Sequence, residues 1–332
     1  EMSENSNVNA VSIADIEYGA TTQMREDPKP MATKLEILEL LLKDKRLGDS
    51  YQIDLVRSGK GPALTKDHEQ KVNKVYYYQD EFPDDYDVVF ITNPTHLHFE
   101  TVCQFVNKTK HMFIEKPVFD RTDISVDSLQ LRRDSVYYVA CPLRYTKVIQ
   151  FIRNEINLQE VYCARVICSS YLPEWRPGQD YRNNYSAKKE LGGGVSLDLI
   201  HEWDYLYYLF GFPNKVFNIK GKYSHLEINS DDLSIYIAEY PKMAVEVHLD
   251  YFGRFPMREI QLFLPHETVI GDLINSEIRF LKERKVIQLP EKRDDFQCKE
   301  IIHFFNLIEG QTNNHNDIFT ALQTLKIAKG EY

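Results

Sequence analysis

The segment DVVFITNPTHLHFETVCQFVNKTKHMFIEKP, residues 87–117, decides the fold of this chain. Its first six residues are an apolar run typical of a strand that is buried on both faces in a parallel sheet. The run stops at Asn93-Pro94-Thr95, and residues 97–107 then have the pattern of a crossover helix that leads to an apolar strand at residues 111–114. The segment therefore predicts one βαβ unit. Asn93-Pro94 and Glu115-Lys116-Pro117 then both lie at carboxyl ends of parallel strands, where open α/β sheets bind ligands.

Lys116 is the candidate for chemistry in this segment, because it ends a strand and precedes a proline that cannot continue a helix. A lysine held in this way is better positioned to exchange a proton than one on a flexible surface arm. Burial or a nearby cation would have to lower its pKa from the ordinary value of about 10.4. Most lysines before a proline are solvated turn residues, so the pentapeptide alone leaves both interpretations open.

The composition indicates an ordinary globular protein of two domains, with 332 residues, 43% of them hydrophobic, and a net charge of −10. The acidic balance argues against nucleic acid or a membrane surface as a partner, although a local basic site for an anionic small molecule is compatible with it. No apolar run approaches the roughly 20 residues that span a bilayer, and no signal peptide is visible.

The cysteines and histidines predict neither disulfides nor a metal. Five cysteines form an odd set without a CxxC pair, which favours reduced thiols and a cytoplasmic location. His96 and His98 could supply two metal ligands, but no cysteine or carboxylate lies near them at the spacing of a metal site. We expect no metal.

The N-terminal part departs from a standard nucleotide-binding unit. Residues 35–42 have a helical apolar pattern and residues 51–56 alternate as a strand, but residues 1–20 are polar and show no recognisable element. Where G-x-G-x-x-G should open the helix, residues 27–33 read DPKPMAT. Prolines lack the N–H groups that bind phosphate, and an aspartate repels it. Residues 1–34 are therefore atypical of the Rossmann-like domain that we expect over residues 1–142.

The rest of the chain predicts a different second domain over residues 143–332. A helix near residues 124–131 and a strand at residues 136–140 complete the first domain, and a helix at residues 145–156 opens the second. Strand-like runs follow at residues 161–170, 215–223, 233–240, 244–251 and 259–264, and helices at residues 300–308 and 317–328. The fold class is therefore α/β plus α+β: a parallel sheet followed by an open, largely antiparallel sheet. An open sheet favours a homo-oligomer.

A second group of chemically active residues follows three glycines in LGGGVSLDLIHEWD, residues 191–204. Glycines permit backbone paths closed to other residues, including a close approach to a ligand. On one continuous helix, an apolar stripe would oppose a polar face. The stripe holds Leu199, Trp203, Leu206 and Phe210, and the polar face holds Asp198, His201, Tyr205 and Tyr208. The alternative is a solvated face with one ion pair. Glu202 and Asp204 are expected to have structural or supporting roles.

The preceding loop, LPEWRPGQDYR at residues 172–182, combines aromatic and guanidinium groups. Such a loop beside a cleft suits a polar ligand that contains a ring, through stacking and paired hydrogen bonds. It could equally contact another subunit, and the sequence leaves both interpretations open.

Taken together, residues 93–98, 115–117 and 192–204 resemble the Gfo/Idh/MocA family of NAD(P)-dependent sugar oxidoreductases, and the resemblance runs from about Tyr51 to the C-terminus. It implies that Lys116 and His201 form the proton-transfer pair and that Asp198 orients or charges the site. It also implies two binding sets. The cofactor side comprises Arg57, Ser58, Thr92, Asn93, Pro94, His98 and Glu115, with the Asn93-Pro94 turn behind the nicotinamide; the substrate side comprises Trp175, Arg176, Tyr181 and Tyr205.

Three details qualify the resemblance. Many members space the aspartate and histidine four apart, whereas Asp198 and His201 are three apart. The family bond before the proline is often cis, which would suit Lys116-Pro117. Arg57-Ser58 stand where an acidic residue would bind the ribose of NAD, so the sequence favours NADP weakly over NAD.

The resemblance implies hydride transfer between a nicotinamide and a hydroxyl or keto carbon of a sugar, with the loop at residues 172–182 favouring a nucleotide-linked or amino sugar. Two alternatives stay open: a non-catalytic sugar-binding or regulatory homologue that has lost the dinucleotide, and an enzyme that holds its cofactor tightly and recycles it on one substrate.

Overall fold

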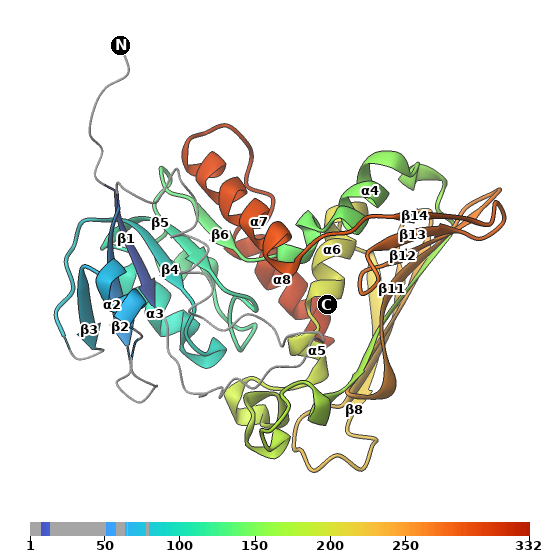
Figure 1. Ribbon diagram of the computed structural model, residues 1–332, viewed down its shortest axis with the longest axis horizontal. Coiled ribbons are helices and arrows are strands. Elements are labelled where there is room, and N and C mark those ends of the chain that lie inside the picture. Colours follow the sequence, from blue (N-terminus) through green and yellow to red (C-terminus); the bar gives the residue numbers. More distant parts are fainter. Residues whose placement is uncertain (1–7, 14–50, 58–63, 65, 78–79) are drawn as a thin grey trace. The chain divides into compact units, whose positions relative to one another are not determined.

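A computed structural model describes residues 8–13, 51–57, 64, 66–77 and 80–332 (Figure 1). The chain divides into two compact units. The first comprises residues 1–140 and 301–319, and the second comprises residues 141–300 and 320–332. The first unit is therefore discontinuous in sequence, which the single division expected after residue 142 does not anticipate.

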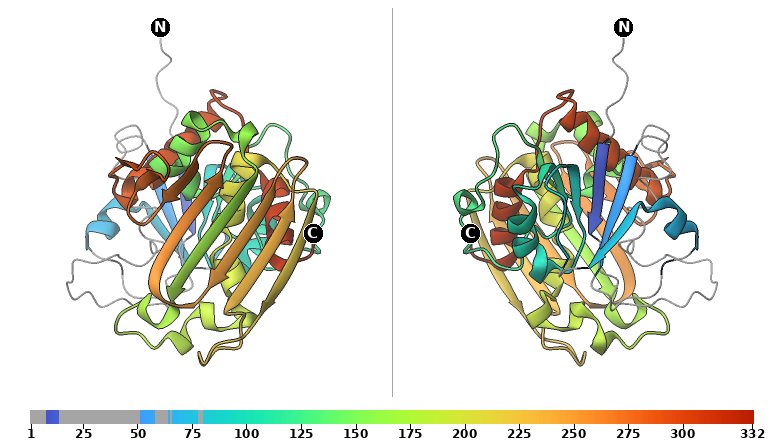
Figure 2. Two further views of the ribbon diagram at one scale, coloured as in Figure 1. Left: turned by 90° about the vertical axis from the view of Figure 1, so that its right-hand side faces the viewer. Right: turned by 90° about the vertical axis from the view of Figure 1, so that its left-hand side faces the viewer.

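The first unit contains a six-stranded sheet, called sheet A here, with the order β3-β2-β1-β4-β5-β6. All five neighbouring pairs are parallel. This order reverses between β1 and β4, as in dinucleotide-binding doubly wound sheets. The strands are β1 (Val8–Ile13), β2 (Tyr51–Arg57), β3 (Lys74–Tyr77), β4 (Tyr86–Ile91), β5 (Thr109–Ile114) and β6 (Tyr137–Val139). The right panel of Figure 2 shows β1 beside β2.

Strand β1 corrects the sequence analysis, which found no element in residues 1–20. It pairs with both β2 and β4 at the centre of sheet A. Strand β1 ends at Ile13, whereas the sequence analysis looked for the phosphate-binding loop at residues 27–33. That loop, the helix expected at residues 35–42 and Ser58 lie outside the described residues.

Aromatic side chains form the core beside sheet A. Phe90 of β4 and Phe113 of β5 lie with ring centroids 5.2 Å apart, and Phe304 packs on both, at 5.7 and 5.4 Å. Tyr138 of β6 completes the cluster, 6.0 Å from Phe304. All four residues are buried almost completely. Residues 301–319 are thus part of the first unit because Phe304 supplies its core.

The helices that the structure describes within residues 1–140 are short. They are α2 (Lys66–Lys71), η1 (Thr95–Leu97), α3 (His98–Phe105) and η2 (Val126–Leu129). The helix expected at residues 124–131 is only the 3-10 turn η2. The expected crossover helix at residues 97–107 is confirmed as η1 followed by α3.

The second unit contains an eight-stranded sheet, called sheet B here, with the order β14-β13-β12-β11-β7-β10-β9-β8. All neighbouring pairs are antiparallel except β7 and β10. The strands are β7 (Cys163–Tyr171), β8 (Lys215–Gly221), β9 (Leu233–Glu239), β10 (Ala244–Asp250), β11 (Phe252–Phe263), β12 (Thr268–Asp272), β13 (Glu277–Phe280) and β14 (Lys285–Gln288).

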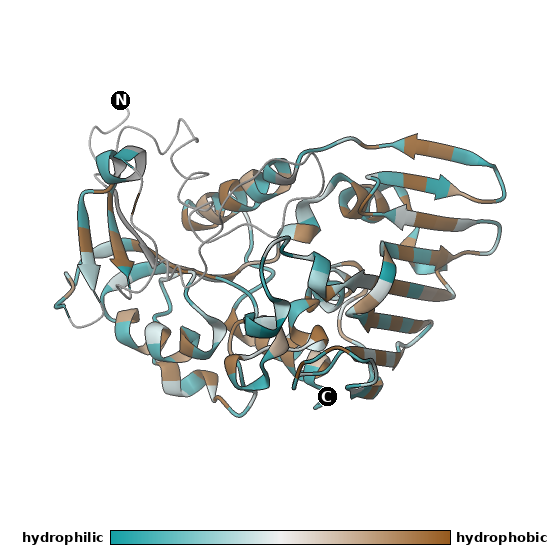
Figure 3. Ribbon diagram, turned by 60° about the horizontal axis from the view of Figure 1, so that its bottom comes forward, coloured by the Kyte–Doolittle hydropathy of each residue, from teal (hydrophilic) through white to brown (hydrophobic). Residues whose placement is uncertain are grey.

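The expected open, largely antiparallel sheet is thus confirmed, with three additional strands, β12 to β14. The left panel of Figure 2 shows the strands of sheet B side by side. Hydrophobic and hydrophilic residues alternate along them in Figure 3. The buried residues of β9, Ser234, Tyr236 and Ala238, alternate with more exposed ones, as expected for a sheet with one covered face.

The α-helices of the remaining chain are α4 (Lys147–Glu155), α5 (Val195–Asp198), α6 (His201–Phe210), α7 (Arg293–Ile308) and α8 (Ile318–Lys329). Short 3-10 turns lie at η3 (Pro142–Tyr145), η4 (Leu158–Glu160), η5 (Leu172–Glu174), η6 (Tyr181–Asn183), η7 (Tyr185–Ala187) and η8 (Lys189–Leu191). No helix in the described part of the chain is long and apolar enough to span a membrane.

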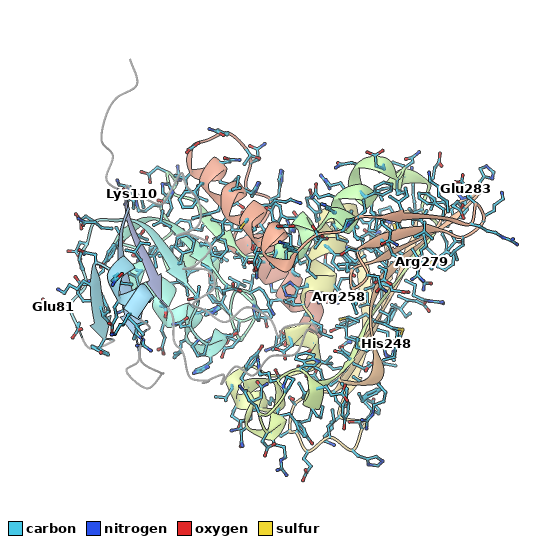
Figure 4. The ribbon with its side chains drawn as sticks, in the orientation of Figure 1. Glu81, Lys110, His248, Arg258, Arg279 and Glu283 are labelled. Atoms are coloured by element: carbon cyan, nitrogen blue, oxygen red, sulfur yellow. The ribbon has the colours of Figure 1, made fainter. Side chains whose placement is uncertain are left out.

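The amphipathic helix expected from Asp198 to Phe210 is wrong in two respects. Leu199 leaves the helical region at φ −99° and ψ 29°, so α5 and α6 are separate helices. The first six residues of α6 are all buried, including Glu202 and Asp204. Their carboxylates bind Arg258 of β11 and Arg144, respectively. These ion pairs neutralise both buried carboxylates, in line with the structural roles expected of Glu202 and Asp204 (Figure 4 labels Arg258).

Candidate functional site

The carboxyl ends of the strands of sheet A lie in one row. The backbone register pairs Val56 with Ile13, Ile13 with Ile91, Ile91 with Ile114, and Ile114 with Val139. The residues that come next in the chain therefore lie along one edge of the sheet, the edge at which open α/β sheets bind ligands. The described ones are Arg57, the Thr92-Asn93-Pro94 turn and the Glu115-Lys116-Pro117 turn.

The Asn93 turn is hydrogen-bonded to a side chain of α3. Asn93 Nδ2 donates to Thr101 Oγ1 at 2.7 Å, and that hydroxyl donates to Leu97 O at 2.8 Å. Asn93 is 3% exposed, yet its Oδ1 accepts no hydrogen bond from any described residue. A buried acceptor without a donor is costly, so this oxygen is suited to an amide or hydroxyl group of a ligand. Thr92 is also fully buried.

The Lys116 turn follows β5. The Lys116-Pro117 peptide bond is cis, in line with the expectation from the resemblance. Glu115 N–H donates to Ile91 O at 2.8 Å, which ties this turn to the end of β4. Lys116 N–H donates to Glu115 Oε2 at 3.2 Å, and both side chains are half-buried.

His98, the first residue of α3, contacts backbone oxygens of both turns. Its Nε2 is 2.8 Å from Asn93 O, and its Nδ1 is 3.0 Å from Pro117 O and 3.3 Å from Val118 O. The side chain is 1% exposed. His98 thus contacts the backbone of both turns, a supporting position that differs from the direct cofactor contact expected from the sequence.

Arg57 is the last residue of β2, paired with Tyr77 of β3, and is 9% exposed. In doubly wound folds this strand end carries the group that binds the ribose of the cofactor. The structure thus places Arg57 at this strand end, and its role in cofactor binding stays a prediction.

In the second unit, Asp198 is the centre of a buried cluster of hydroxyl groups. Tyr251 OH donates to Asp198 Oδ2 at 2.5 Å, and the Tyr185 side chain also hydrogen-bonds this carboxylate. Burial, followed by the Asp198 charge, raises the pKa of both tyrosines above the ordinary value. Both phenols therefore stay protonated and donate to Asp198 at neutral pH.

Two residues of the loop at residues 172–182 join this cluster. The ring of Trp175 packs edge-on against Tyr251, with centroids 5.1 Å apart, and its Nε1 donates to Ser170 Oγ at 2.8 Å. The guanidinium of Arg176 lies 5.4 Å from the centroid of the Tyr185 ring. Aromatic faces and a cation thus surround the carboxylate, a set that suits a sugar or nucleotide.

Two other predicted residues lie apart from Asp198. Tyr205 is fully buried, and burial with the Glu202 charge raises its pKa, so it belongs to the Glu202–Arg258 cluster. Its hydroxyl has no hydrogen-bond partner among the described residues. Tyr181 OH accepts the backbone N–H of Glu227 at 3.1 Å, at the surface of the loop. His201 begins α6 and is 3% exposed.

The glycines before α5 make close contacts within the protein. A Cβ on Gly193 would lie 2.0 Å from Tyr185 O, and one on Gly194 would lie 2.4 Å from Asp231 Oδ1. Gly194 also has φ +130°, which other residues rarely adopt. The expected special backbone path is present. It brings the turn before Asp198 against the segment that carries Tyr185.

Sequence reasoning missed Tyr185 and Tyr251. Tyr251 lies at the end of an expected strand, and Tyr185 lies in a loop, so neither had a motif or a periodicity that marked it. Only the contact with Asp198, which is 53 residues away from Tyr251, identifies the role. For metals, the described residues contain no group of three or more His, Cys, Asp or Glu side chains that could hold an ion.

Residues 49–131 match the family model described as oxidoreductase family, NAD-binding Rossmann fold, of the Gfo/Idh/MocA group. A 2,7-anhydro-N-acetylneuraminate hydratase of Escherichia coli is 27% identical over 161 residues, which are 47% of this chain and 43% of that protein. An uncharacterised oxidoreductase of Synechocystis is 28% identical over 126 residues, 37% of this chain and 34% of that protein. The matched segment thus spans less than half the length of these curated relatives.

Solved structures share the whole fold at low identity. A levoglucosan dehydrogenase has a TM-score of 0.76 at 14% identity, with 98% of this chain and 95% of that one covered. A UDP-N-acetylglucosamine 3-dehydrogenase from Acidithiobacillus ferrooxidans has a TM-score of 0.68 at 16% identity, with 98% and 97% covered. The strand order of sheet A agrees with the family match, so residues 49–131 are similar to the NAD-binding Rossmann part of the Gfo/Idh/MocA oxidoreductases, and the chain as a whole shares the fold of these solved structures.

Proposed function

We propose that this protein is an NAD(P)-dependent dehydrogenase or reductase that acts on a CH–OH or keto carbon of a sugar or a nucleotide-linked sugar. The observation that carries the proposal is the row of strand ends in sheet A, where the register brings the Asn93 turn and the Lys116 turn to neighbouring positions. A nicotinamide, when bound, supplies the hydride chemistry, and the protein supplies binding, orientation and proton transfer.

The residues at this edge fit a nicotinamide cofactor. The unpartnered Asn93 Oδ1 offers a buried acceptor, as a carboxamide N–H requires. Thr92, Pro94, Glu115 and Arg57 complete the proposed cofactor side. We further propose a preference for NADP, because an arginine at the end of β2 can accept a 2′-phosphate that an acidic residue would repel.

The proton chemistry is assigned to Lys116 and His201. One of them takes the hydroxyl proton as hydride leaves the carbon, or returns it in the reverse direction. Asp198 accepts hydrogen bonds from two phenols and is proposed to orient this chemistry. Trp175, Arg176 and Tyr181, all in the loop at residues 172–182, are proposed to bind the sugar or nucleotide part of the substrate. Tyr205 is fully buried beside Glu202 and Arg258, so a supporting role is proposed for it.

The similar proteins support a sugar as the substrate class. Their names include a UDP-N-acetylglucosamine dehydrogenase, a levoglucosan dehydrogenase and a hydratase of an anhydro sugar acid. The hydratase favours a second candidate, in which the cofactor stays bound and the hydride returns to the same substrate. Such an enzyme would purify with nicotinamide bound and would show no net change in NADH absorbance.

A fluorescence titration with NADPH and NADH tests the proposal first. At least one of the two cofactors is expected to bind below millimolar concentration. If neither binds at millimolar concentration, the oxidoreductase assignment is wrong and a non-catalytic homologue is favoured. Lys116→Ala is expected to keep cofactor binding and lose about 10²- to 10⁴-fold in turnover on sugar substrates. The matched control is Lys110→Ala, an exposed lysine in β5, the strand that precedes Lys116; Lys110 pairs with Asp87.

The cofactor preference has its own test. Arg57→Asp should weaken NADPH binding about tenfold or more and improve NADH binding, because the carboxylate repels the 2′-phosphate and can bind the ribose hydroxyl. Equal effects on both cofactors would count against the NADP assignment while leaving the oxidoreductase proposal intact.

We propose that sheet B contacts a second copy of the chain. Phe217 and Ile219 of β8 are 56% and 64% exposed, and Ile237 of β9, 47% exposed, pairs with Phe217 in the register. Light scattering should report a dimer or tetramer, and Phe217→Asp should weaken it. We also propose a cytoplasmic setting, because all five cysteines are free thiols.

A further inference from the structure

The ring of His98 faces backbone carbonyl oxygens on both of its sides. Nε2 lies 2.8 Å from Asn93 O, and Nδ1 lies 3.0 Å from Pro117 O and 3.3 Å from Val118 O. A carbonyl oxygen only accepts hydrogen bonds. Each ring nitrogen must therefore carry a proton for its contact to be attractive.

A neutral imidazole cannot satisfy this arrangement, because it has one N–H and one lone pair. Either tautomer would place the lone pair against a carbonyl oxygen at about 3 Å in a site that is 1% exposed. The imidazolium donates on both sides. A buried cation is costly to desolvate, but charge-assisted hydrogen bonds to main-chain carbonyls offset that cost.

His111 provides a contrast within the same unit. Its Nδ1 accepts the backbone N–H of Val136 at 3.0 Å, so that nitrogen carries no proton. Burial is also the largest cause that lowers the pKa of His111. The structure thus gives two histidines of one domain opposite protonation states, His98 charged and His111 neutral.

We propose that His98 is a permanently protonated positioning residue, which fixes the Asn93 turn and the Lys116-Pro117 turn and places a positive charge beside Lys116. It joins the turns because its two N–H groups bind the carbonyls of both. Other charged or titratable groups on the contacting elements are Glu115 and Lys116 after β5, and His96 and Glu100 on η1 and α3.

The positive charge on His98 favours the neutral form of the Lys116 amine. A nearby cation disfavours a second positive charge, so it favours the neutral amine that can take a proton from a carbinol. This consequence rests on the proposed function of Lys116. The protonation of His98 does not rest on it, because it follows from the hydrogen bonds alone.

NMR of the wild-type full chain with ¹⁵N-labelled histidine rings tests the protonation. At about pH 8.5, two units above the ordinary histidine pKa of about 6.5, one of the ten histidines should still show the paired nitrogen shifts of a doubly protonated ring. That signal should vanish in His98→Gln and persist in His96→Gln, the matched control two residues away. If no histidine is doubly protonated at this pH in the wild type, the proposal is overturned, whether or not His98→Gln folds.

The effect on Lys116 is measured separately by reductive methylation with ¹³C-formaldehyde and NMR titration of the dimethyl-lysines, with the Lys116 signal assigned by its loss in Lys116→Arg. His98→Gln should raise the Lys116 midpoint by about one unit, whereas His96→Gln should leave it unchanged. An unchanged midpoint in His98→Gln would overturn the electrostatic part. Neither measurement uses cofactor or substrate, so failure of the proposed dehydrogenase activity cannot be confused with failure of this inference.

Discussion

The buried ion pair between Arg144 and Asp204 predicts different pH responses for the two ways of breaking it. Arg144 Nε and Nη2 donate to the two carboxylate oxygens at 2.9 and 2.7 Å, and the side chains are 3% and 9% exposed. The guanidinium also lies 5.5 and 5.3 Å from the ring centroids of Tyr207 and Tyr208. Removing one partner leaves the other charge buried without compensation.

Each single change should cost about 3–5 kcal/mol of unfolding free energy. In Asp204→Asn the guanidinium cannot lose its proton, so this variant cannot relieve the buried charge by titration at any pH. In Arg144→Met the carboxyl can neutralise itself. Burial already raises the pKa of Asp204 while Arg144 lowers it, so without Arg144 that pKa rises further.

The direction in which stability changes with pH follows from proton linkage. A carboxyl whose folded-state pKa exceeds its unfolded value of about 3.9 binds more protons when folded, so stability is lost as pH rises through the folded pKa. Arg144→Met should therefore recover stability relative to wild type as the pH falls through the raised pKa of Asp204, which lies above its ordinary value. The double variant Arg144→Met with Asp204→Leu should cost less than either single change, because apolar residues of similar volume replace both charges.

Urea unfolding followed by tryptophan fluorescence is the assay. The only two tryptophans, Trp175 and Trp203, both lie in the second unit, so their signal reports the unit that holds the ion pair. A penalty of 3–5 kcal/mol corresponds to a loss of about 10 °C in Tm for a domain of this size. The reasoning is refuted if the penalty of Arg144→Met is the same at all pH values, or if Asp204→Asn is as stable as wild type.

Three further changes have defined outcomes. Tyr251→Phe removes the 2.5 Å donor to Asp198 and should cost about 1.5–3 kcal/mol of stability by urea unfolding; a variant as stable as wild type would contradict this. Gly193→Ala should lower Tm by several degrees in calorimetry, since its Cβ would lie 2.0 Å from a backbone oxygen. Phe304→Ala should cost about 3–5 kcal/mol in the first unit. Its loss should appear in circular dichroism more than in tryptophan fluorescence, and equal shifts in both would argue against it.

The parts of the fold that the sequence predicts are those with strong local signals. The apolar runs at β4 and β5 and the E-K-P turn identify the ligand-binding edge directly. Strand β1, VNAVSI, contains the polar residues Asn9 and Ser12 and lacks such a run, so its place between β2 and β4 becomes visible only through pairing. Strands β12 to β14 are four or five residues long, too short for a reliable period-two pattern.

The prediction of one continuous helix from Asp198 is wrong for a different reason. Periodicity assigns residues to the faces of a helix, but it cannot identify the charged partners of Glu202 and Asp204. Those partners, Arg258 and Arg144, lie 56 and 60 positions away in the sequence. The hydroxyl groups around Asp198 are likewise assembled by long-range contacts, so the sequence could name the carboxylate but could not identify Tyr185 or Tyr251 as its donors.

The late entry of Phe304 into the core of the first unit has a consequence for biosynthesis. Proteins emerge from the ribosome N-terminus first, and domains generally fold in that order. Here the aromatic cluster of Phe90, Phe113 and Tyr138 lacks Phe304 until more than three hundred residues have been made. The first unit is therefore completed only after residues 141–300 of the second unit have been made, and its nascent sheet exposes apolar surface to chaperones during their synthesis.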